Sequence, residues 1–276
     1  TLFKYRLQSL TMGKMFMPTK KAVLITGASS GIGYELSKLF AKDGYNLVLV
    51  AIDEERLKQI TNELKENFGI EIKAIPKDLS VAKSPKEIFD ELQQESIQID
   101  ILVNNAGVGS FGYFSETDLT KELQMIQVNL VSLTHLTKLF LSEMLKHGYG
   151  KILNVGSVGS FIPNTLSAVY GATKAYVLSF SEAIAEELQG TGITVTVLCP
   201  STTKTNFHKR AQVENTKHEG MDPRIVAKIG YRSVLKGKRI VIPGIFNKLR
   251  IFLIRFMPRN LIAKIVKNQM SERLDK

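Results

Sequence analysis

The chain of 276 residues has no tryptophan and a single cysteine, Cys199. One cysteine cannot form a disulfide within the chain, which excludes a disulfide-stapled secreted domain and favours a reducing compartment. We therefore expect a cytoplasmic protein. Histidines are also few, at four, and none has the paired spacing of metal ligands, so no metal site is predicted.

Long apolar runs are missing as well. The longest are interrupted by charge well short of the roughly 20 residues that span a bilayer, and residues 1–20 lack the apolar centre of a signal peptide. We exclude residues 1–20 from the expected fold, as an N-terminal arm or the remnant of a misassigned start. No linker or repeat divides the remainder, so we expect one domain over residues 21–243 and a tail over residues 244–276.

Acidic residues are scarce at both ends of a chain whose net charge is +11. Residues 1–21 contain five Lys or Arg and no acid, and residues 231–276 contain twelve against Glu272 and Asp275. Residues 22–230 are slightly acidic. This charge distribution therefore excludes nucleic acid as a partner of the core. Contact between the basic tail and an anionic surface stays open.

What the chain does have is an alternation of short Val/Ile/Leu-rich runs with longer amphipathic stretches. Such runs are typical of strands buried on both faces, and strand–helix alternation implies right-handed crossovers in a parallel sheet. We predict an α/β, single-domain, doubly wound Rossmann-type sheet of seven parallel strands with helices on both faces. The expected strands are Ala22–Thr26, Asn46–Ala51, Glu71–Ile75, Ile99–Asn104, Lys151–Gly156, Thr194–Leu198 and Arg239–Ile242.

A glycine-rich turn follows the first expected strand, with the sequence Thr-Gly-Ala-Ser-Ser-Gly-Ile-Gly over residues 26–33. Glycines let backbone amides approach a pyrophosphate, which then lies at the positive end of the next helix, expected over Tyr34–Asp43. A tight strand–helix turn that binds nothing is the alternative. The position between strand and helix favours binding.

Tyr170 and Lys174 lie four residues apart on a stretch expected to be helical from Ser167 to Leu188, so both side chains share one helix face. A lysine cation favours the phenolate form of a neighbouring tyrosine, whose free pKa is about 10. The pair suits a hydride transfer, in which the carbonyl oxygen must gain or lose a proton. A purely structural pair is the alternative, because the spacing is common on helices.

Two further segments argue against a purely structural role for the Tyr170–Lys174 pair. Ser157 follows the strand expected over Lys151–Gly156, and Asn104–Gly107 ends another strand. Carboxyl ends of parallel strands share one edge of the sheet, so these residues are expected at one rim with the glycine turn.

Taken together, Thr26–Gly33, Asn104–Gly107, Asn129, Ser157, Tyr170 and Lys174 resemble the single-domain branch of the short-chain dehydrogenase/reductase family, including bacterial ketoacyl reductases and hydroxysteroid dehydrogenases. The resemblance covers residues 21–242. It implies an NAD(P)(H)-dependent oxidoreductase that interconverts a ketone or aldehyde and an alcohol, acting as a reductase on an apolar or lipid-like carbonyl.

The resemblance also implies residue roles. Tyr170 would be the acid in reduction and the base in oxidation, Ser157 would polarise the carbonyl, and Lys174 would bind the nicotinamide ribose and lower the Tyr170 pKa. Asn129 would hold a water in a proton relay, although an ordinary helix-surface role stays open. Besides Tyr170 and Lys174, the implied cofactor-binding residues are Gly27, Ser29, Ser30, Gly31, Ile32, Gly33, Ala51, Ile52, Asp78, Leu79, Asn105, Ala106, Gly107, Pro200 and Thr205.

Cofactor preference follows from departures within that pattern. Ser30 and Ile52 stand where NADP-preferring relatives often carry a base, and Ala51 stands where NAD-preferring relatives carry an acid. Asp53 comes two residues later, where a helix start is an equal alternative. The small Ala51 leaves room for a 2′-phosphate, so NADP(H) is favoured slightly and NAD(H) is not excluded. Ser201 replaces the family's glycine after Pro200.

Substrate identity is not predicted. Residues 201–221 are polar and placed to cover the site as a lid. Phe111, Phe114 and Phe161 are candidates for an apolar pocket, with core packing the stronger expectation for each. A homodimer or homotetramer is expected through a long helix over Ser115–Lys146 and the Tyr170 helix.

Two other functions remain as alternatives: a nucleotide-binding scaffold that lost catalysis, and a membrane-surface protein built around the tail. In the tail, Leu249, Phe252, Leu253 and Phe256 share a helix face, Pro258 should end that helix, and Leu261, Ile262, Ile265 and Val266 line a second one. We expect both faces to pack on the body or on a partner subunit. Peripheral contact with an anionic membrane is the alternative.

Overall fold

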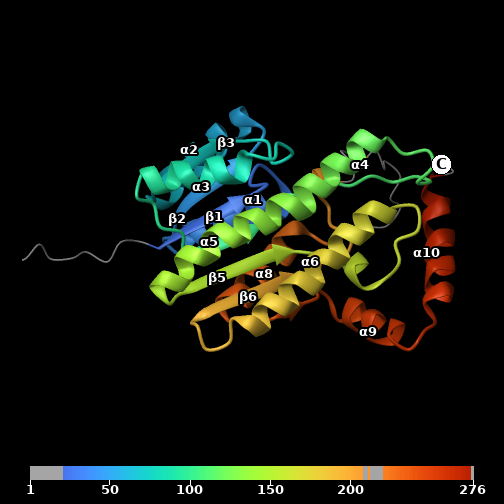
Figure 1. Ribbon diagram of the computed structural model, residues 1–276. Helices are drawn as coiled ribbons and strands as arrows, with labels where there is room; N and C mark the ends of the chain where they lie inside the picture. Colours follow the sequence, from blue (N-terminus) through green and yellow to red (C-terminus); the bar gives the residue numbers. More distant parts are fainter. Residues whose placement is uncertain (1–20, 208–210, 212–219, 275–276) are drawn as a thin grey trace, which may run out of the picture.

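The computed structural model describes residues 21–207, 211 and 220–274 (Figure 1). Seven parallel strands form one sheet in the order β3-β2-β1-β4-β5-β6-β7. They are β1 Ala22–Thr26, β2 Asn46–Ala51, β3 Ile72–Pro76, β4 Ile101–Asn104, β5 Gly150–Val155, β6 Ile193–Leu198 and β7 Ile240–Val241. The predicted doubly wound α/β fold is therefore confirmed. The expected N-terminal arm, residues 1–20, lies outside the described residues.

Burial on both faces explains why the strands could be located from their composition. All five residues of β1 are buried, as are five of the six residues of β2. The bounds differ from expectation by at most two residues, and β7 shrinks to two residues at the edge of the sheet.

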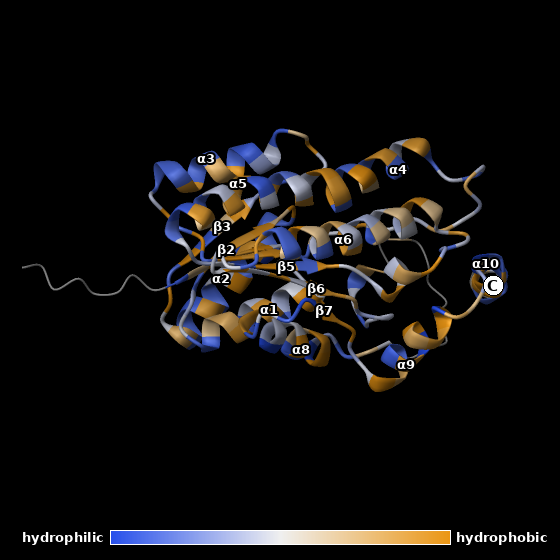
Figure 2. Cartoon of the chain, turned by 60° about the horizontal axis from the view of Figure 1, so that its bottom comes forward, coloured by the Kyte–Doolittle hydropathy of each residue, from blue (hydrophilic) through white to orange (hydrophobic). Residues whose placement is uncertain are grey.

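Helices cover both faces of the sheet (Figures 1 and 2). One face packs on α1 Gly31–Lys42, α2 Glu54–Phe68 and α8 Pro223–Leu235, and the other on α3 Ser84–Gln94, α5 Leu133–His147 and α6 Ala168–Glu187. Each face has its own apolar cluster, and the largest fully buried side chain, Phe40, lies on the α1 side.

The long helix expected over Ser115–Lys146 is instead a series of three segments. It begins as α4 Leu119–Ile126, because the Asp118 carboxylate caps the helix by accepting the Thr120 N–H at 2.8 Å. A π-helical segment, η1 Gln127–Ser132, then leads into α5. Wide turns of this kind inside α-helices frequently mark functional sites.

The sheet also fixes where a ligand can bind. Strand order reverses between β1 and β4, the central pair, since β1 continues to β2 and β3 on one side and β4 to β5 on the other. In open parallel sheets the crevice at the carboxyl ends of such strands is the ligand site.

Two helices follow β7 and extend past the sheet near the N-terminal end of α6: α9 Ile245–Ile254 and α10 Arg259–Leu274 (Figures 1 and 2). The break at Pro258 is as predicted. Packing of both apolar faces on the body is wrong for α9, whose face is solvent-exposed. On α10, Ile262 and Val266 are buried, whereas Leu261 and Ile265 are exposed. The exposed fractions on the α9 side are Leu249 54%, Phe252 54%, Leu253 53% and Phe256 75%.

Candidate active site

The glycine turn joins β1 to α1 and is too tight for side chains. A Cβ atom on Gly33 would lie 2.3 Å from the Gly27 carbonyl oxygen, and Gly27 and Gly31 have φ angles of +64° and +57°. Ser30 is the N-cap residue of α1 but its hydroxyl makes no capping hydrogen bond, and the first turn of α1 has no acid. The amides at this helix start are therefore available to an anion such as a pyrophosphate.

The neighbouring strand end holds this turn in place. The Thr26 hydroxyl accepts the N–H groups of Asn105 and Ala106, each at 3.0 Å. The Asn105 side chain donates to the carbonyls of Thr26 and Gly27 at 3.0 and 3.1 Å. Asn105 thus supports the turn from below, while Gly107 continues toward the catalytic side of the crevice.

At the end of β2, Ala51 is buried at 7% exposure and Ile52 is 70% exposed. The Asp53 carboxylate accepts the Arg56 N–H at 3.0 Å and caps α2. The helix-start alternative for Asp53 is therefore the one that the structure shows. Neither a free acid nor a base stands at the strand end itself.

Asp78 and Leu79 lie in the connection after β3. The Asp78 carboxylate accepts the Ser80 N–H at 2.8 Å, which orders this connection ahead of α3. The Leu79 side chain is buried in the core, and its carbonyl accepts the Ser132 hydroxyl at 2.7 Å. Leu79 therefore connects the β3 rim to η1.

Ser157 lies directly beyond β5, where it caps a short 3₁₀ helix, η2 Val158–Phe161. Its hydroxyl accepts the Gly159 N–H at 3.0 Å. The hydroxyl of Ser160, a residue that the sequence did not single out, donates to the Lys174 carbonyl at 2.7 Å. This bond fastens η2 to α6, so the serine position is set by two elements.

Tyr170 and Lys174 share a face of α6, as their spacing predicts. The Ser157 side chain lies near enough to the Tyr170 hydroxyl to lower its pKa. The Lys174 side chain is buried at 5% exposure, and its ammonium donates to the Val155 carbonyl at 2.8 Å. Serine, tyrosine and lysine therefore converge at the carboxyl end of β5.

The expected lowering of the Tyr170 pKa by Lys174 is wrong for this structure. Burial raises the pKa of Tyr170 to about 12, and the nearby Ser157 side chain only partly opposes this increase. Desolvation lowers the pKa of Lys174 to about 8. The Lys174 ammonium is directed at the Val155 carbonyl and lies 5.9 Å from the centre of the tyrosine ring, too far to hydrogen-bond the ring face.

Asn129 lies in η1 and is buried at 1% exposure, so it is not a helix-surface residue. Its side chain accepts the Val108 N–H at 2.9 Å and donates to the Val108 carbonyl and the Thr173 hydroxyl at 2.9 and 3.1 Å. A Cβ on Gly107 would lie 3.3 Å from Asn129 Oδ1 and 3.5 Å from Lys174 Nζ. Asn129 and Lys174 thus flank the same glycine.

Aromatic rings surround Tyr170. The Phe111 and Phe207 ring centres lie 6.3 and 5.6 Å from that of Tyr170. Phe114 is 66% exposed, and Phe161 packs on a buried cluster, so neither flanks the tyrosine. Phe207 was missed by the sequence analysis, although an aromatic residue in an otherwise polar expected lid was a usable signal.

The segment after β6 runs back across the rim. The Pro200 carbonyl accepts the Val158 N–H at 2.9 Å, and Ser201 accepts a hydrogen bond from the Asn247 side chain at 3.1 Å. The Thr205 methyl group would be 2.7 Å from a Cβ on Gly31. The first part of the expected lid therefore lies over the glycine turn, while residues 208–210 and 212–219 fall outside the described residues.

The site therefore combines an anion-binding helix start, a buried phenol with a serine partner, and a buried lysine amine along one crevice. A phenol with a raised pKa is a proton donor at neutral pH, and the serine hydroxyl can share a hydrogen bond with an oxygen held there. This arrangement is suited to acid–base chemistry at a carbonyl or alcohol oxygen.

Comparison with known proteins agrees with this arrangement. Residues 21–216 match the family described as short chain dehydrogenase. The ketoacyl reductase HetN of Nostoc sp. is 34% identical over 182 residues, which cover 66% of this chain and 63% of that protein. The chain thus aligns with less than two thirds of this relative's length.

Two solved structures are similar over most of the chain. A short-chain dehydrogenase from Sphingobium yanoikuyae in complex with NADPH is 31% identical with a TM-score of 0.78, covering 87% of this chain and 97% of that one. A bulky-bulky ketone specific alcohol dehydrogenase from Comamonas testosteroni is 31% identical with a TM-score of 0.74, covering 87% and 95%. The chain therefore belongs to the short-chain dehydrogenase family of NAD(P)-dependent oxidoreductases, as its sequence motifs predict.

Proposed function

We propose that this protein reduces an apolar carbonyl compound to an alcohol, with Tyr170 as proton donor, Ser157 as the partner of the carbonyl oxygen and Lys174 as the positioning cation. The observation that carries the proposal is the convergence of the Ser157 and Tyr170 side chains beside the buried Lys174 amine. Ser157 comes from the end of β5, whereas Tyr170 and Lys174 come from one face of α6.

The protonation state of Tyr170 supports the reductive direction. With a pKa of about 12, Tyr170 is protonated at neutral pH and can give its proton to a carbonyl oxygen as that oxygen becomes an alcohol. Oxidation would first require loss of that proton. Asn129, hydrogen-bonded beside Lys174, is placed to hold a water that returns the proton from solvent.

The cofactor implied by the family fits the residues present. The Gly27–Gly33 turn has no space for side chains, and the amides at the start of α1 would hold the pyrophosphate. Asp78, Leu79, Asn105, Ala106 and Gly107 would border the adenine half, and Pro200 and Thr205 the nicotinamide half. A bound nicotinamide supplies or accepts a hydride. Lys174 would hold the adjoining ribose.

NADP(H) is the proposed preference. The small Ala51 leaves room for a 2′-phosphate at the strand end, and the nearest acid, Asp53, is engaged in capping α2. The Sphingobium yanoikuyae relative binds NADPH, which supports the assignment. Because Ile52 and Ser30 supply no positive charge, the preference over NAD(H) should be modest.

An apolar substrate is supported by the rings around the tyrosine. Phe111 and Phe207 flank Tyr170, so apolar aromatic surface adjoins the tyrosine ring on two sides. The ketoacyl reductase and the bulky-ketone dehydrogenase are relatives whose names agree with a bulky or acyl-type carbonyl.

A carbonyl panel tests the proposal. Ketones and aldehydes of increasing apolar size are incubated with NADPH or NADH, and oxidation of the cofactor is followed by absorbance. We expect turnover that increases with apolar size, and a loss of about a hundredfold or more in Ser157→Ala. Ser142→Ala is the matched control, since that hydroxyl lies exposed on α5 and bonds only its own helix at Lys138. No turnover with any carbonyl, or equal loss in both variants, contradicts the proposal.

We also propose a homodimer or homotetramer. Leu119 and Leu123 on α4, with Val131 on η1, are exposed at 68%, 56% and 39%, and α4 packs beside α6. Symmetric association through these helices would cover them. Light scattering at micromolar concentration should give a multiple of the chain mass, and Leu123→Lys should reduce it. A monomer would refute this part.

Finally, we propose a cytoplasmic protein that attaches peripherally to anionic membranes through α9 and α10. None of the helices in the described part of the chain has the length and hydropathy needed to cross a bilayer. Residues 245–271 contain six Lys or Arg and no acid, together with the exposed apolar face of α9. Cosedimentation should be salt-sensitive and stronger with anionic than with neutral vesicles. Equal sedimentation with both would argue against attachment.

A further inference from the structure

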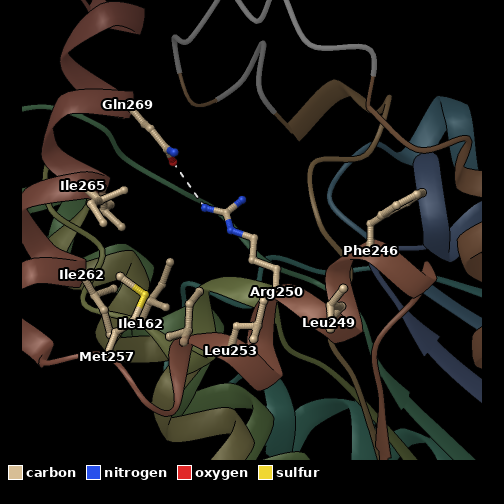
Figure 3. Close-up of a pocket in the computed structure, with 11 residues that line it drawn as sticks. Ile162, Phe246, Leu249, Arg250, Leu253, Met257, Ile262, Ile265 and Gln269 are labelled. Carbon is tan, nitrogen blue, oxygen red and sulfur yellow. Dashed lines mark hydrogen bonds between the residues drawn. The ribbon is translucent and has the colours of Figure 1, made fainter.

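The helices α9 and α10 line a cavity of about 380 Å³ that is open to solvent (Figure 3). The third wall is Ile162, five residues after Ser157, and the Thr165 hydroxyl fastens α10 to this side by donating to the Ala263 carbonyl at 3.0 Å. The lining residues are Ile162, Phe246, Leu249, Arg250, Leu253, Ile254, Met257, Ile262, Ile265, Val266 and Gln269.

This volume is within the range of about 300–1,000 Å³ that small-molecule sites occupy. The cavity's side chains also remain accessible, with Leu253 at 53% and Ile265 at 37% exposure on opposite walls.

The lining has a marked chemical asymmetry. Nine of the eleven residues are apolar, and only one of these, Phe246, is aromatic. The two polar residues, Arg250 and Gln269, point toward each other across the gap between the helices, where Arg250 Nη2 donates to Gln269 Oε1 at 3.3 Å (Figure 3). An alkyl chain would contact the aliphatic walls, while an acidic group at its end would meet the guanidinium.

We propose that this cavity binds the chain of a single-chain anionic amphiphile of fatty-acid type, with its acidic group at Arg250. The charge of the region is complementary, because the six Lys and Arg residues between Ile245 and Ser271 are accompanied by no acid. A neutral aromatic ligand or a polar nucleotide would leave either the cation or the aliphatic walls without a matching group. The site does not depend on the proposed reduction.

Calorimetric titration with dodecanoate, kept below its micelle concentration, tests the proposal. We expect saturable binding of one dodecanoate per chain. Leu253→Trp places a larger side chain inside the cavity and should weaken binding about tenfold or more. Leu261→Trp is the matched control, since Leu261 is 45% exposed on α10 and does not line the cavity. Circular dichroism of both variants checks that the fold is retained.

The acidic end of the ligand is tested separately. Arg250→Gln should weaken dodecanoate about tenfold and leave dodecanol unaffected, because only the carboxylate can pair with the guanidinium. Arg255→Gln, an exposed arginine outside the lining, should change neither. Non-saturable uptake that is alike in all variants, or a second copy of the chain covering the face and excluding dodecanoate, would overturn the proposal.

A competition experiment decides whether the alkyl chain in the cavity belongs to the substrate or to a separate lipid. If dodecanoate inhibits reduction of long-chain ketones but not of short ones, the cavity holds the substrate's own chain. If it inhibits neither while still binding, the occupant is a separate lipid, and the same amphiphile presented in vesicles should bind as well. Either result satisfies the proposal, and activity toward short ketones reports on the proposed function independently.

Discussion

Tyr170→Phe is the substitution that separates the proposed chemistry from the fold. The change removes one hydroxyl and keeps a ring between Phe111 and Phe207, whose centres lie 6.3 and 5.6 Å away. Loss of a positioned proton donor typically reduces turnover by about 10²–10⁴. At about 1.36 kcal/mol for each factor of ten, this corresponds to roughly 3–5 kcal/mol of transition-state stabilisation.

The substitution should lower the free energy of unfolding by much less than this. With its pKa raised to about 12, the phenol is neutral at pH 7, so its removal leaves no unpaired charge in the site. The loss is at most one neutral polar interaction with the Ser157 side chain, and a neutral hydrogen bond contributes only about 0.5–1.5 kcal/mol. For a chain of this size the midpoint of thermal unfolding should fall by only a few degrees.

Tyr176→Phe supplies the matched control. Tyr176 is on the same helix, its hydroxyl is hydrogen-bonded to Thr134 at 2.9 Å, and its ring stacks on Phe180. Both variants should unfold at similar temperatures and bind NADPH as the wild type does in a fluorescence titration. Only Tyr170→Phe should lose NADPH oxidation with a confirmed carbonyl substrate. Turnover within about tenfold of the wild type in Tyr170→Phe, or an equal loss in Tyr176→Phe, would refute the reasoning.

Three further predictions concern the cofactor side of the site. With a Lys174 pKa of about 8, the positive charge is present below that pH, so kcat/KM for reduction should fall as pH rises through about 8, and Lys174→Arg should remove this decline from any residual activity. Gly33→Ala should weaken NADPH binding about tenfold or more in calorimetry, because its Cβ would lie 2.3 Å from a carbonyl oxygen. Gly69→Ala is the control: Gly69 has a φ of +60° and nothing within 4 Å of a Cβ, so the change should lower stability by about 1 kcal/mol and leave NADPH binding unchanged. Ala51→Asp should reverse the preference toward NADH, and tighter NADH than NADPH binding by the unmodified protein would contradict the cofactor assignment.

The sheet was predictable because strands covered on both faces must be apolar throughout, and this requirement is visible in composition alone. The first residues of the helices were harder to predict from the sequence. The expected helix at Ser115 begins only at Leu119, since the Asp118 cap, not the apolar periodicity, determines its first turn. The π-helical turn that holds Asn129 has no marker in the spacing of apolar residues.

In the site, the motifs predicted which residues meet but not their electrostatics. The pKa values of Tyr170 and Lys174 depend on how deeply each group is buried and on where the lysine ammonium points, here toward the Val155 carbonyl. Neither property is encoded in a four-residue spacing. The contact between Phe207 and Tyr170 is likewise tertiary, since it joins the segment after β6 to α6.

In the tail, the periodicity of apolar residues predicted the helices but not what covers their apolar faces. Apolar residues at spacings of three and four predicted the two helices, and Pro258 predicted the break between them, but an amphipathic face indicates only that something apolar should cover it. Packing on the body or on a partner subunit was the expected cover, and of the residues expected on these two faces only Ile262 and Val266 are buried within the chain. Burying one exposed leucine or phenylalanine is worth about 1.5–3 kcal/mol, so an α9 face with four such side chains left in water is a substantial unfavourable surface. The lack of acids from Ile245 to Ser271 makes this region uniformly basic, which favours an anionic partner. Apolar periodicity combined with charge of one sign therefore supports the proposed surface for anionic amphiphiles on α9 and α10, at the end of the molecule where Ile162 adjoins the short 3₁₀ helix that Ser157 caps.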